Sequence, residues 1–142
     1  MKMKKAMTNE YQVTFEEIKK LAEQGDVDAK RNVGYMYFHG EGIEQNYNEA
    51  YNWFKKAADQ DDPGSEYALG LMYQYGEGVE LNHKEAYNWF KKAAEHGDSC
   101  SQLSLSWMII NGIGVQKNEE EAFSWFKKAA EHEGIGPNLS CT

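Results

Sequence analysis

The side chains that could perform chemistry are few in this sequence, and they form no recognisable catalytic or metal-binding group. The four histidines are His39, His83, His96 and His132, and no His-Glu-x-x-His, Cys-x-x-Cys or Ca²⁺-loop spacing occurs. A Gly-x-Ser-x-Gly nucleophile motif is absent as well. His96 and His132 occupy equivalent predicted helix ends, where a cation suits the helix dipole, so we expect both to be solvated. The sequence therefore predicts a protein that is not an enzyme and that binds no metal or other cofactor.

The acidic run and the two cysteines also favour a structural interpretation. The run Asp59–Asp62 directly precedes Pro63. We expect it to end one helix and cap the next, with weak cation binding as the alternative. Cys100 and Cys141 stand at different positions of the repeat described below, and the other repeats lack cysteine there. This pattern predicts free, incidental thiols rather than a disulfide framework.

Glycine pairs recur three times, but they do not have the pattern of a phosphate-binding loop. A dinucleotide-binding fingerprint requires Gly-x-Gly-x-x-Gly between a strand and a helix, whereas here helical patterns stand on both sides of each pair. Glycine adopts positive φ at little steric cost and commonly ends helices. The pairs therefore predict a tight turn after one helix of each repeat: Gly40/Gly42, Gly76/Gly78 and Gly112/Gly114.

The strongest pattern in the chain is a period of 36 residues. Trp53, Trp89 and Trp125 follow this interval, and each lies in a nearly identical segment of the form Ala-Tyr-Asn-Trp-Phe-Lys-Lys-Ala-Ala. A fixed period of this length indicates a stacked array of supersecondary units, each of which buries its apolar face on the next. Such arrays generally offer an extended surface rather than a closed catalytic cavity.

Each unit contains two predicted helices. The second helix begins at an Asn with Glu three residues later, which is the pattern of a capping box. Small residues at Gly34, Gly70 and Ser106 of the first helices predict close helix contacts, because a mid-helix glycine costs about 1 kcal/mol relative to alanine. The expected packing positions of the first helices share i, i+4, i+7/i+8 spacing: Ala29/Val33/Met36/Tyr37, Ser65/Leu69/Met72/Tyr73 and Ser101/Leu105/Met108/Ile109.

The period also predicts the organisation of the chain. We expect a flexible N-terminal segment over 1–13, a repeat domain over 14–133 and a C-terminal tail over 135–142. Within the domain, residues 14–26 form a half-repeat that covers the first full unit, as capping elements of repeat arrays do. The full repeats are predicted over 28–62, 64–98 and 100–134.

The pattern Ala-x-x-x-Leu-Gly-x-x-Tyr-x-x-Gly-x-Gly-Val, followed by Ala-x-x-Trp-Phe-x-Lys-Ala-Ala, resembles the Sel-one-like repeat family, which is related to tetratricopeptide repeats. The copy from Ser65 to Ala94 matches best, and Ser106 and Ile109 are departures in the third copy. The resemblance implies an all-α fold, a right-handed α/α superhelical solenoid of helix-turn-helix repeats, and use as a protein-interaction scaffold. Cysteine-rich relatives with a Cys pair in every repeat have been associated with peptidoglycan-related ligands, but this chain has no such pairs.

Charge and hydropathy exclude other classes of partner. A net charge of -8 argues against a nucleic-acid-binding protein, and no segment has the roughly 18 apolar residues of a membrane span. The start Met1–Lys5 resembles the beginning of a signal peptide, but the following residues are too polar to continue one. We therefore expect a soluble, cytoplasmic protein, with secretion by a route independent of a signal peptide as the alternative.

The tetratricopeptide-like geometry places the first helices along the concave side. Their face that is not used for packing differs between units and is rich in aromatic and apolar residues, which is typical of a groove for a peptide. Alternatively, some of these side chains pack against neighbouring helices. Trp107 is the first candidate among the predicted partner-binding residues, which are Arg31, Tyr35, Phe38, Tyr67, Leu71, Gln74, Leu103, Trp107 and Ile110.

The leading functional hypothesis is a scaffold or adaptor that binds a peptide or partner domain on this concave face. One alternative is a bacterial secreted or host-interaction effector that uses the same surface. A second is a cell-wall-ligand-binding protein or small hydrolase. We also predict a homodimer through the C-terminal repeat, because the apolar stripe of its second helix, Ala122/Trp125/Phe126/Ala129, has no following unit.

Overall fold

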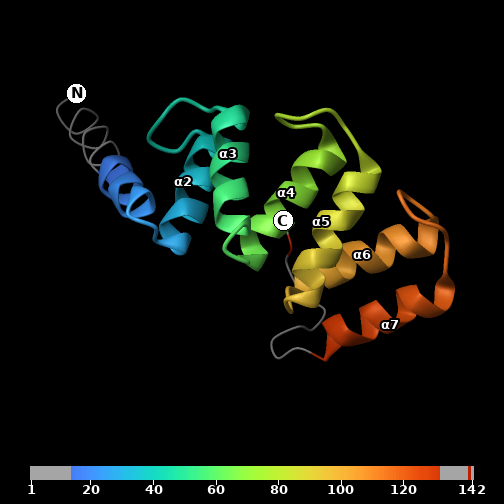
Figure 1. The fold of residues 1–142 in the computed structure, drawn as a ribbon. Coiled ribbons are helices and arrows are strands. Elements are labelled where there is room, and N and C mark those ends of the chain that lie inside the picture. Colours follow the sequence, from blue (N-terminus) through green and yellow to red (C-terminus); the bar gives the residue numbers. More distant parts are fainter. Residues whose placement is uncertain (1–13, 132–140, 142) are drawn as a thin grey trace, which may run out of the picture. The chain divides into compact units, whose positions relative to one another are not determined.

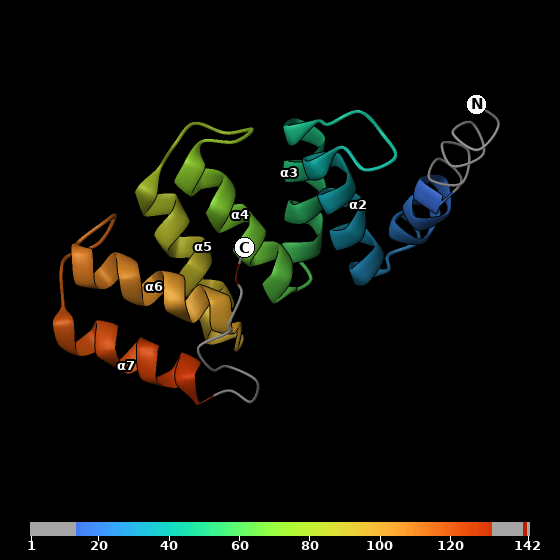
Figure 2. The ribbon, with the colours of Figure 1, turned by 180° about the vertical axis from the view of Figure 1, so that it is seen from behind.

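All regular elements in the described part of the chain are helices. A computed structural model describes residues 14–131 and Cys141, and the predicted segment 1–13, His132 and most of the predicted tail lie outside these residues. Residues 14–23 are helical. Six further helices follow, as labelled in Figures 1 and 2: α2 (Val27–His39), α3 (Tyr47–Ala58), α4 (Pro63–Tyr75), α5 (His83–Glu95), α6 (Ser99–Asn111) and α7 (Glu119–Ala130).

An aspartate caps the first helix of every repeat. The side chains of Asp26, Asp62 and Asp98 accept hydrogen bonds from backbone N–H groups three residues later, at 2.9, 3.0 and 2.8 Å. These caps satisfy N–H groups that have no partner within the helix. The interpretation of the acidic run as a capping segment is confirmed at Asp62, which is buried and also accepts the hydroxyl of Ser65 at 2.6 Å.

An asparagine caps the second helix of every repeat, as predicted. The side chain of Asn46 accepts the N–H of Glu49 at 3.0 Å, and Asn82 and Asn118 cap in the same way. The predicted capping box takes a different form, because the backbone N–H of Asn46 donates to the carbonyl of Tyr37 at 2.8 Å. The cap residue therefore also fastens the second helix to the end of the first.

The predicted close contacts at Gly34 and Gly70 are confirmed. A Cβ atom at either position would lie 2.6 Å from the ring of Phe54 or Phe90, respectively, and both rings are fully buried. In the third repeat Ser106 takes the place of glycine, and its hydroxyl donates to the carbonyl of Ala122 at 2.7 Å. Phe126, at the position equivalent to Phe90, is 51% exposed. In the third repeat, the contact between the two helices at this position is thus a hydrogen bond and not a buried aromatic ring.

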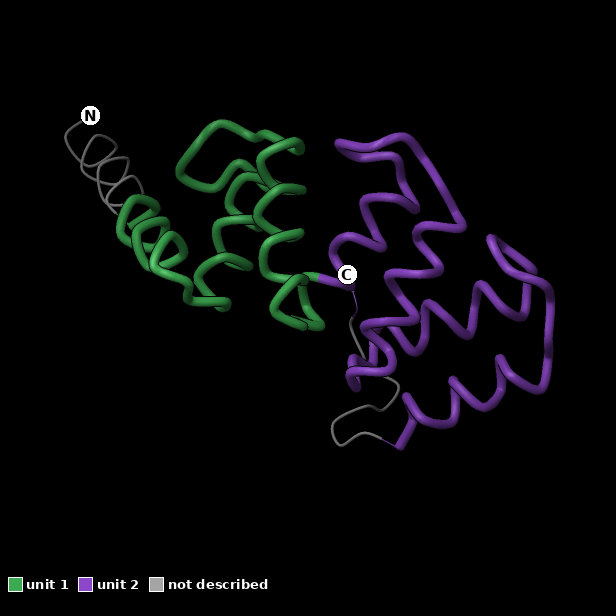
Figure 3. Tube along the Cα trace, viewed as in Figure 1, with its two compact units in different colours: residues 1–65 green, residues 66–142 purple. Residues whose placement is uncertain are grey.

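The chain divides into two compact units, residues 1–65 and 66–142 (Figure 3). In the first unit, the helix over residues 14–23 contributes Phe15 and Ala22 to a core with Ala29, Val33 and Trp53. The side chain of Phe15 packs edge-on against Tyr37, with 5.4 Å between ring centroids. The short N-terminal helix thus covers apolar surface of the first repeat.

The second unit has a core of its own. Helix α5 packs on α6 and α6 packs on α7, and both views show α6 and α7 side by side (Figures 1 and 2). The predicted packing positions of the first helices are confirmed here, since Leu69, Met72, Leu105 and Met108 are fully buried. The core cluster consists of Ala86, Phe90, Ala94, Leu105, Met108, Ile109 and Ala122.

The prediction of two free thiols is wrong. Cys100, in the first turn of α6, forms a disulfide with Cys141, and their Cα atoms lie 5.3 Å apart. This Cα separation is ordinary for a disulfide. The repeat pattern could not reveal the bond, because Cys141 stands beyond the last repeat and the two cysteines occupy no common repeat position. The bond covalently closes a stretch with a sequence separation of 41 residues.

Candidate protein-interaction groove

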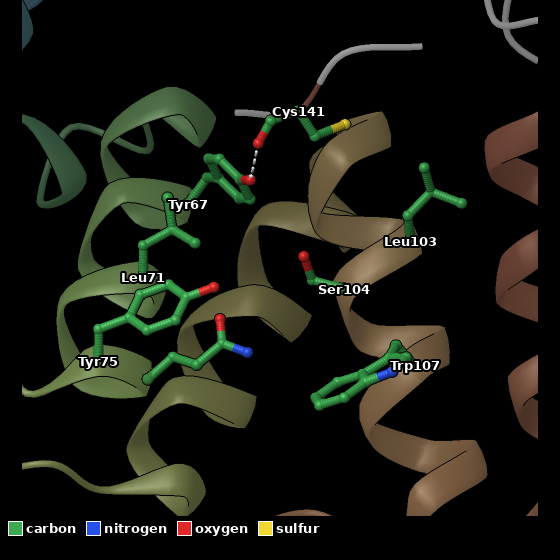
Figure 4. Close-up of a pocket in the computed structure, with 8 residues that line it drawn as sticks. Tyr67, Leu71, Tyr75, Leu103, Ser104, Trp107 and Cys141 are labelled. Carbon is green, nitrogen blue, oxygen red and sulfur yellow. Dashed lines mark hydrogen bonds between the residues drawn. The ribbon is translucent and has the colours of Figure 1, made fainter. Parts of the chain in front are cut away.

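A groove of about 580 Å³ lies on the second unit between α4 and α6 (Figure 4). Figure 4 shows side chains extending into it from both helices, with Tyr75 on one wall and Trp107 on the other. We call this the α4–α6 groove. It is lined by Tyr67, Leu71, Gln74, Tyr75, Leu103, Ser104, Trp107 and Cys141.

Helical spacing explains why these residues share one surface. On α4, Tyr67, Leu71 and Gln74 stand at i, i+4 and i+7 and therefore lie on one face. The opposite face of α4 is fixed in the core by Leu69 and Met72. On α6, buried Leu105 and Met108 likewise orient the helix, so that Leu103 and Trp107 face outward. The core positions thus hold the two walls of the groove in place.

The α4–α6 groove is aromatic and uncharged. None of its eight lining residues is Asp, Glu, Lys, Arg or His. Tyr75 is 63% exposed and Trp107 is 51% exposed, so both rings offer apolar surface that a partner could bury. The Tyr75 hydroxyl, the Gln74 amide and the indole N–H of Trp107 supply hydrogen-bond donors. This combination suits a peptide segment, which brings backbone carbonyls together with apolar side chains.

Cys141 lies at the Tyr67 end of the α4–α6 groove. The Tyr67 hydroxyl donates a hydrogen bond to the backbone carbonyl of Cys141 at 2.7 Å (Figure 4). The same residue is tied to the start of α6 by its disulfide with Cys100. Sequence reasoning missed Cys141, Tyr75 and Ser104 as lining residues; Tyr75 could have been included, because it stands eight residues after Tyr67 on the same helix face.

Five of the nine residues predicted to bind a partner line this groove: Tyr67, Leu71, Gln74, Leu103 and Trp107. Tyr67 and Leu71 also pack partly against the core of the second unit, and the Tyr67 ring lies 5.7 Å from that of Phe90. The alternative that these side chains pack within the fold therefore holds in part for Tyr67 and Leu71. Ile110 is 45% exposed and lies outside the groove lining.

The three predicted residues of the first unit make local contacts. Arg31 forms ion pairs with Asp62 at 2.7 Å and with Asp28 at 3.0 Å. Burial lowers the pKa of Arg31, but the charges and hydrogen bonds of the two carboxylates outweigh it, so the net pKa is raised. Tyr35 packs edge-on against Phe54, with 5.0 Å between centroids. Phe38 lies 5.1 Å from the ring of Tyr47.

His96 is exposed, as the sequence predicted, but it also contacts a buried carboxylate that the sequence analysis did not pair with it. Its Nδ1 atom lies 2.7 Å from Oε1 of Glu66, a carboxylate that is fully buried, and Lys92 Nζ lies 3.9 Å from the other carboxylate oxygen. The equivalent pair of the first repeat is Lys30 and Gln60, whose side chains hydrogen bond at 2.6 Å. Glu66 and His96 stand one period after Lys30 and Gln60, so a contact in one repeat predicts the corresponding contact in the next.

Helical hairpins that recur along the chain with the same caps define a helical-repeat protein. The Sel1 repeat model matches residues 27–62, 63–98 and 99–133. The chain therefore belongs to the Sel1 repeat family, and the all-α helical-repeat fold expected from the sequence is confirmed. Proteins of this family generally mediate protein–protein interactions and are typically non-enzymatic.

Several solved structures are similar to this chain. A protective antigen of uropathogenic Escherichia coli with an SLR fold has 35% identity and a TM-score of 0.83, over 85% of this chain and 26% of that protein. A Sel1 repeat protein from Oxalobacter formigenes has 32% identity and a TM-score of 0.84, over 93% of this chain and 54% of that one. Cysteine-rich protein B of Helicobacter pylori has 26% identity and a TM-score of 0.65, over 82% of this chain and 88% of that one.

The chain thus spans about a quarter of the length of the first of these proteins and about half of the second. No curated protein matches the chain. Among the described helices, none combines the length and the apolar character that crossing a membrane requires.

Proposed function

We propose that the protein is a non-enzymatic interaction module that binds a peptide segment of a partner protein in the α4–α6 groove. The observation that supports this most is Trp107, which is half exposed in the wall of an uncharged aromatic groove. Tryptophan and tyrosine are enriched among the residues that contribute most to binding. The neutral lining favours a segment that is apolar and extended, and the net charge of -8 disfavours nucleic acid as the partner.

The exposed surface of Trp107 sets its expected contribution to the free energy of peptide binding. A tryptophan has about 250 Å² of accessible surface, and 51% of it is exposed. Burying most of that half removes about 100–125 Å² from water, which is worth about 2.5–3 kcal/mol at ~25 cal/mol per Å². Trp107→Ala should therefore weaken peptide binding by about 60–150-fold.

A displayed library of random twelve-residue peptides, selected on the immobilised protein, would provide the probe. The selected peptide is then titrated by fluorescence anisotropy against wild type, Trp107→Ala and the matched control Phe123→Ala. Phe123 is 67% exposed on α7 and lies outside the groove lining. We expect the loss of affinity for Trp107→Ala alone, with an unchanged helical circular dichroism spectrum. Equal binding by all three proteins would contradict the proposal, and so would cooperative unfolding of Trp107→Ala.

Similarity to a protective antigen of uropathogenic Escherichia coli supports the second candidate, a bacterial effector that uses the same groove on a host protein. The disulfide also bears on location, because disulfides persist in oxidising compartments and are rare in reducing ones. A cytoplasmic protein should carry reduced Cys100 and Cys141, whereas an exported one should carry the bond. Trapping of thiols in intact bacteria, followed by mass spectrometry of this peptide pair, separates the two.

The homodimer predicted through Ala122/Trp125/Phe126/Ala129 remains a proposal, although Ala122 and Ala129 of this stripe are buried within the second unit. Phe123 and Phe126 of α7 are 67% and 51% exposed, so this helix presents two aromatic side chains to solvent. Burial of such a pair between two copies would be favourable. Light scattering at increasing concentration tests it, and a mass of one chain at millimolar concentration would refute it.

A further inference from the structure

One residue of this chain already occupies part of the α4–α6 groove. Cys141 lines it, and its backbone carbonyl accepts a hydrogen bond from the Tyr67 hydroxyl at 2.7 Å (Figure 4). A bound peptide would present the same kind of group, a backbone carbonyl, to the same donor. Tyr67 can donate only one hydrogen bond. Cys141 and the end of an incoming peptide therefore compete for one donor and one place.

The disulfide controls this competition. Cys141 is held covalently to Cys100, in the first turn of the helix that forms one wall of the groove. A tethered group has an effective concentration in the millimolar range, which a free peptide in solution does not reach. Without the disulfide, the hydrogen bond from Tyr67 is what the described residues still offer Cys141, and a single hydrogen bond of this kind adds little net stability.

We propose that the Cys100–Cys141 disulfide is a redox-controlled clasp that keeps Cys141 at the Tyr67 end of the groove and weakens peptide binding until it is reduced. The proposal rests on the proposed function, since it names what regulates the same groove. Cys100 does not line the groove, so the bond can be removed by substitution at Cys100 without changing the identity of any lining residue.

The opening step is a two-electron thiol–disulfide exchange with a dithiol reductant. A thiolate of the dithiol attacks one sulfur of the Cys100–Cys141 bond, forms a mixed disulfide and releases the other cysteine as a thiolate. The second thiol of the reductant then displaces the remaining cysteine. The protein gains two electrons and two protons, and the reductant becomes an intramolecular disulfide. Closure is the reverse reaction, with an oxidised dithiol as acceptor.

The change in peptide affinity depends on the fraction of molecules in which Cys141 leaves the Tyr67 end of the groove free. If the clasp leaves about one molecule in ten open, the apparent affinity for a peptide falls about tenfold. The binding experiment compares the oxidised protein, the protein reduced with dithiothreitol, and Cys100→Ser. The probe is a peptide selected from the random library on Cys100→Ser. We expect about tenfold tighter binding to the reduced protein and to Cys100→Ser than to the oxidised protein, and no response of Cys100→Ser to dithiothreitol.

A second measurement does not depend on any peptide. Labelling with ¹⁵N-cysteine reports the order of the Cys141 amide, which should be rigid in the oxidised protein (order parameter near ~0.85) and mobile in the reduced one (below about 0.6). Tyr67→Phe keeps the disulfide but removes the donor for which Cys141 and the peptide compete, so it should narrow the difference in peptide affinity between the oxidised and the reduced protein.

The outcomes separate the two proposals. Equal peptide affinity in the oxidised and reduced states would refute the clasp while leaving the peptide groove intact. Failure of Cys100→Ser and of the reduced protein to bind any selected peptide would refute the proposed function itself, and the competitive role of Cys141 with it. A Cys141 amide that stays rigid after reduction would also overturn the clasp, because the bond would then not be what holds the residue.

Discussion

Replacement of Gly70 by alanine tests the packing of the repeat with a change of one methyl group. In an isolated helix this substitution stabilises by about 1 kcal/mol. Here the new Cβ would lie 2.6 Å from two ring carbons of Phe90, whose side chain is fully buried. Ordinary carbon contacts are about 3.5–4.0 Å, so the ring or the helix must shift by about 1 Å within a close-packed core.

Overpacking of this kind costs about 1–3 kcal/mol, and a rigid aromatic ring places the cost toward the upper end. After subtraction of the gain in helix propensity, we expect Gly70→Ala to lower the free energy of unfolding by about 1–2 kcal/mol. Urea denaturation followed by circular dichroism measures this change. The double variant Gly70→Ala/Phe90→Leu should lose less than the sum of the two single variants, because a smaller side chain leaves space for the methyl group.

A result of the opposite sign would refute the reasoning. If Gly70→Ala raises the free energy of unfolding, helix propensity dominates, and the contact with Phe90 does not explain the glycine. Additive losses in the double variant would show that the two positions do not share one contact. Ser106→Gly offers a comparison in the third repeat, where it removes the hydrogen bond to the carbonyl of Ala122.

Three further perturbations have defined expectations. Asp61 has a φ of 60°, whereas glycines stand at the equivalent positions Gly25 and Gly97. Asp61→Gly should therefore raise the free energy of unfolding, measured by urea denaturation, by up to about 1 kcal/mol. A loss of stability would show that the entropy of the unfolded state dominates. His96→Ala should destabilise by about 1–3 kcal/mol because it removes the hydrogen-bond partner at 2.7 Å from Oε1 of the buried Glu66. His83 is exposed, so the control His83→Ala should change the stability little. Burial, followed by the charges of Glu121 and Glu95, raises the pKa of Tyr87 above its usual 10.0. A raised pKa means that the folded state holds the hydroxyl proton of Tyr87 more tightly than the unfolded state does. The contribution of Tyr87 to the free energy of unfolding is therefore complete below pH 10 and is lost at higher pH. Tyr87→Phe should lose less stability than wild type between pH 9 and 11, and parallel curves would contradict this assignment.

The sequence predicted those features that the period repeats. Three copies of the same caps and the same packing positions reinforce one another, so the helices, the turns and the outward face of α4 and α6 followed from spacing alone. Asp26 and Asp98 recur at the same interval from Asp62, whose run was predicted to cap a helix, and could have been predicted as caps too. Features that occur once could not be found this way.

The disulfide and the unequal roles of the units are such features. No periodic argument could pair Cys100 with a cysteine beyond the last repeat, and helical spacing says nothing of where a residue outside the repeats lies. Arg31 occupies the same repeat position as Tyr67, but the nearby Asp28 and Asp62 bind its guanidinium. The outward faces of α2 and α4 stand at equivalent repeat positions. They nevertheless differ in how available they are to a partner, because the side chains around them differ.

The Cys100–Cys141 bond also has a mechanical consequence. If the chain is pulled at its two ends, the load passes directly from Cys100 to Cys141, and the stretch between them carries no tension. Since the cysteines are 41 residues apart in sequence, about 140 Å of extension is withheld, at ~3.4 Å per residue. In a single-molecule stretching experiment, addition of a reductant should release this hidden length as a separate step.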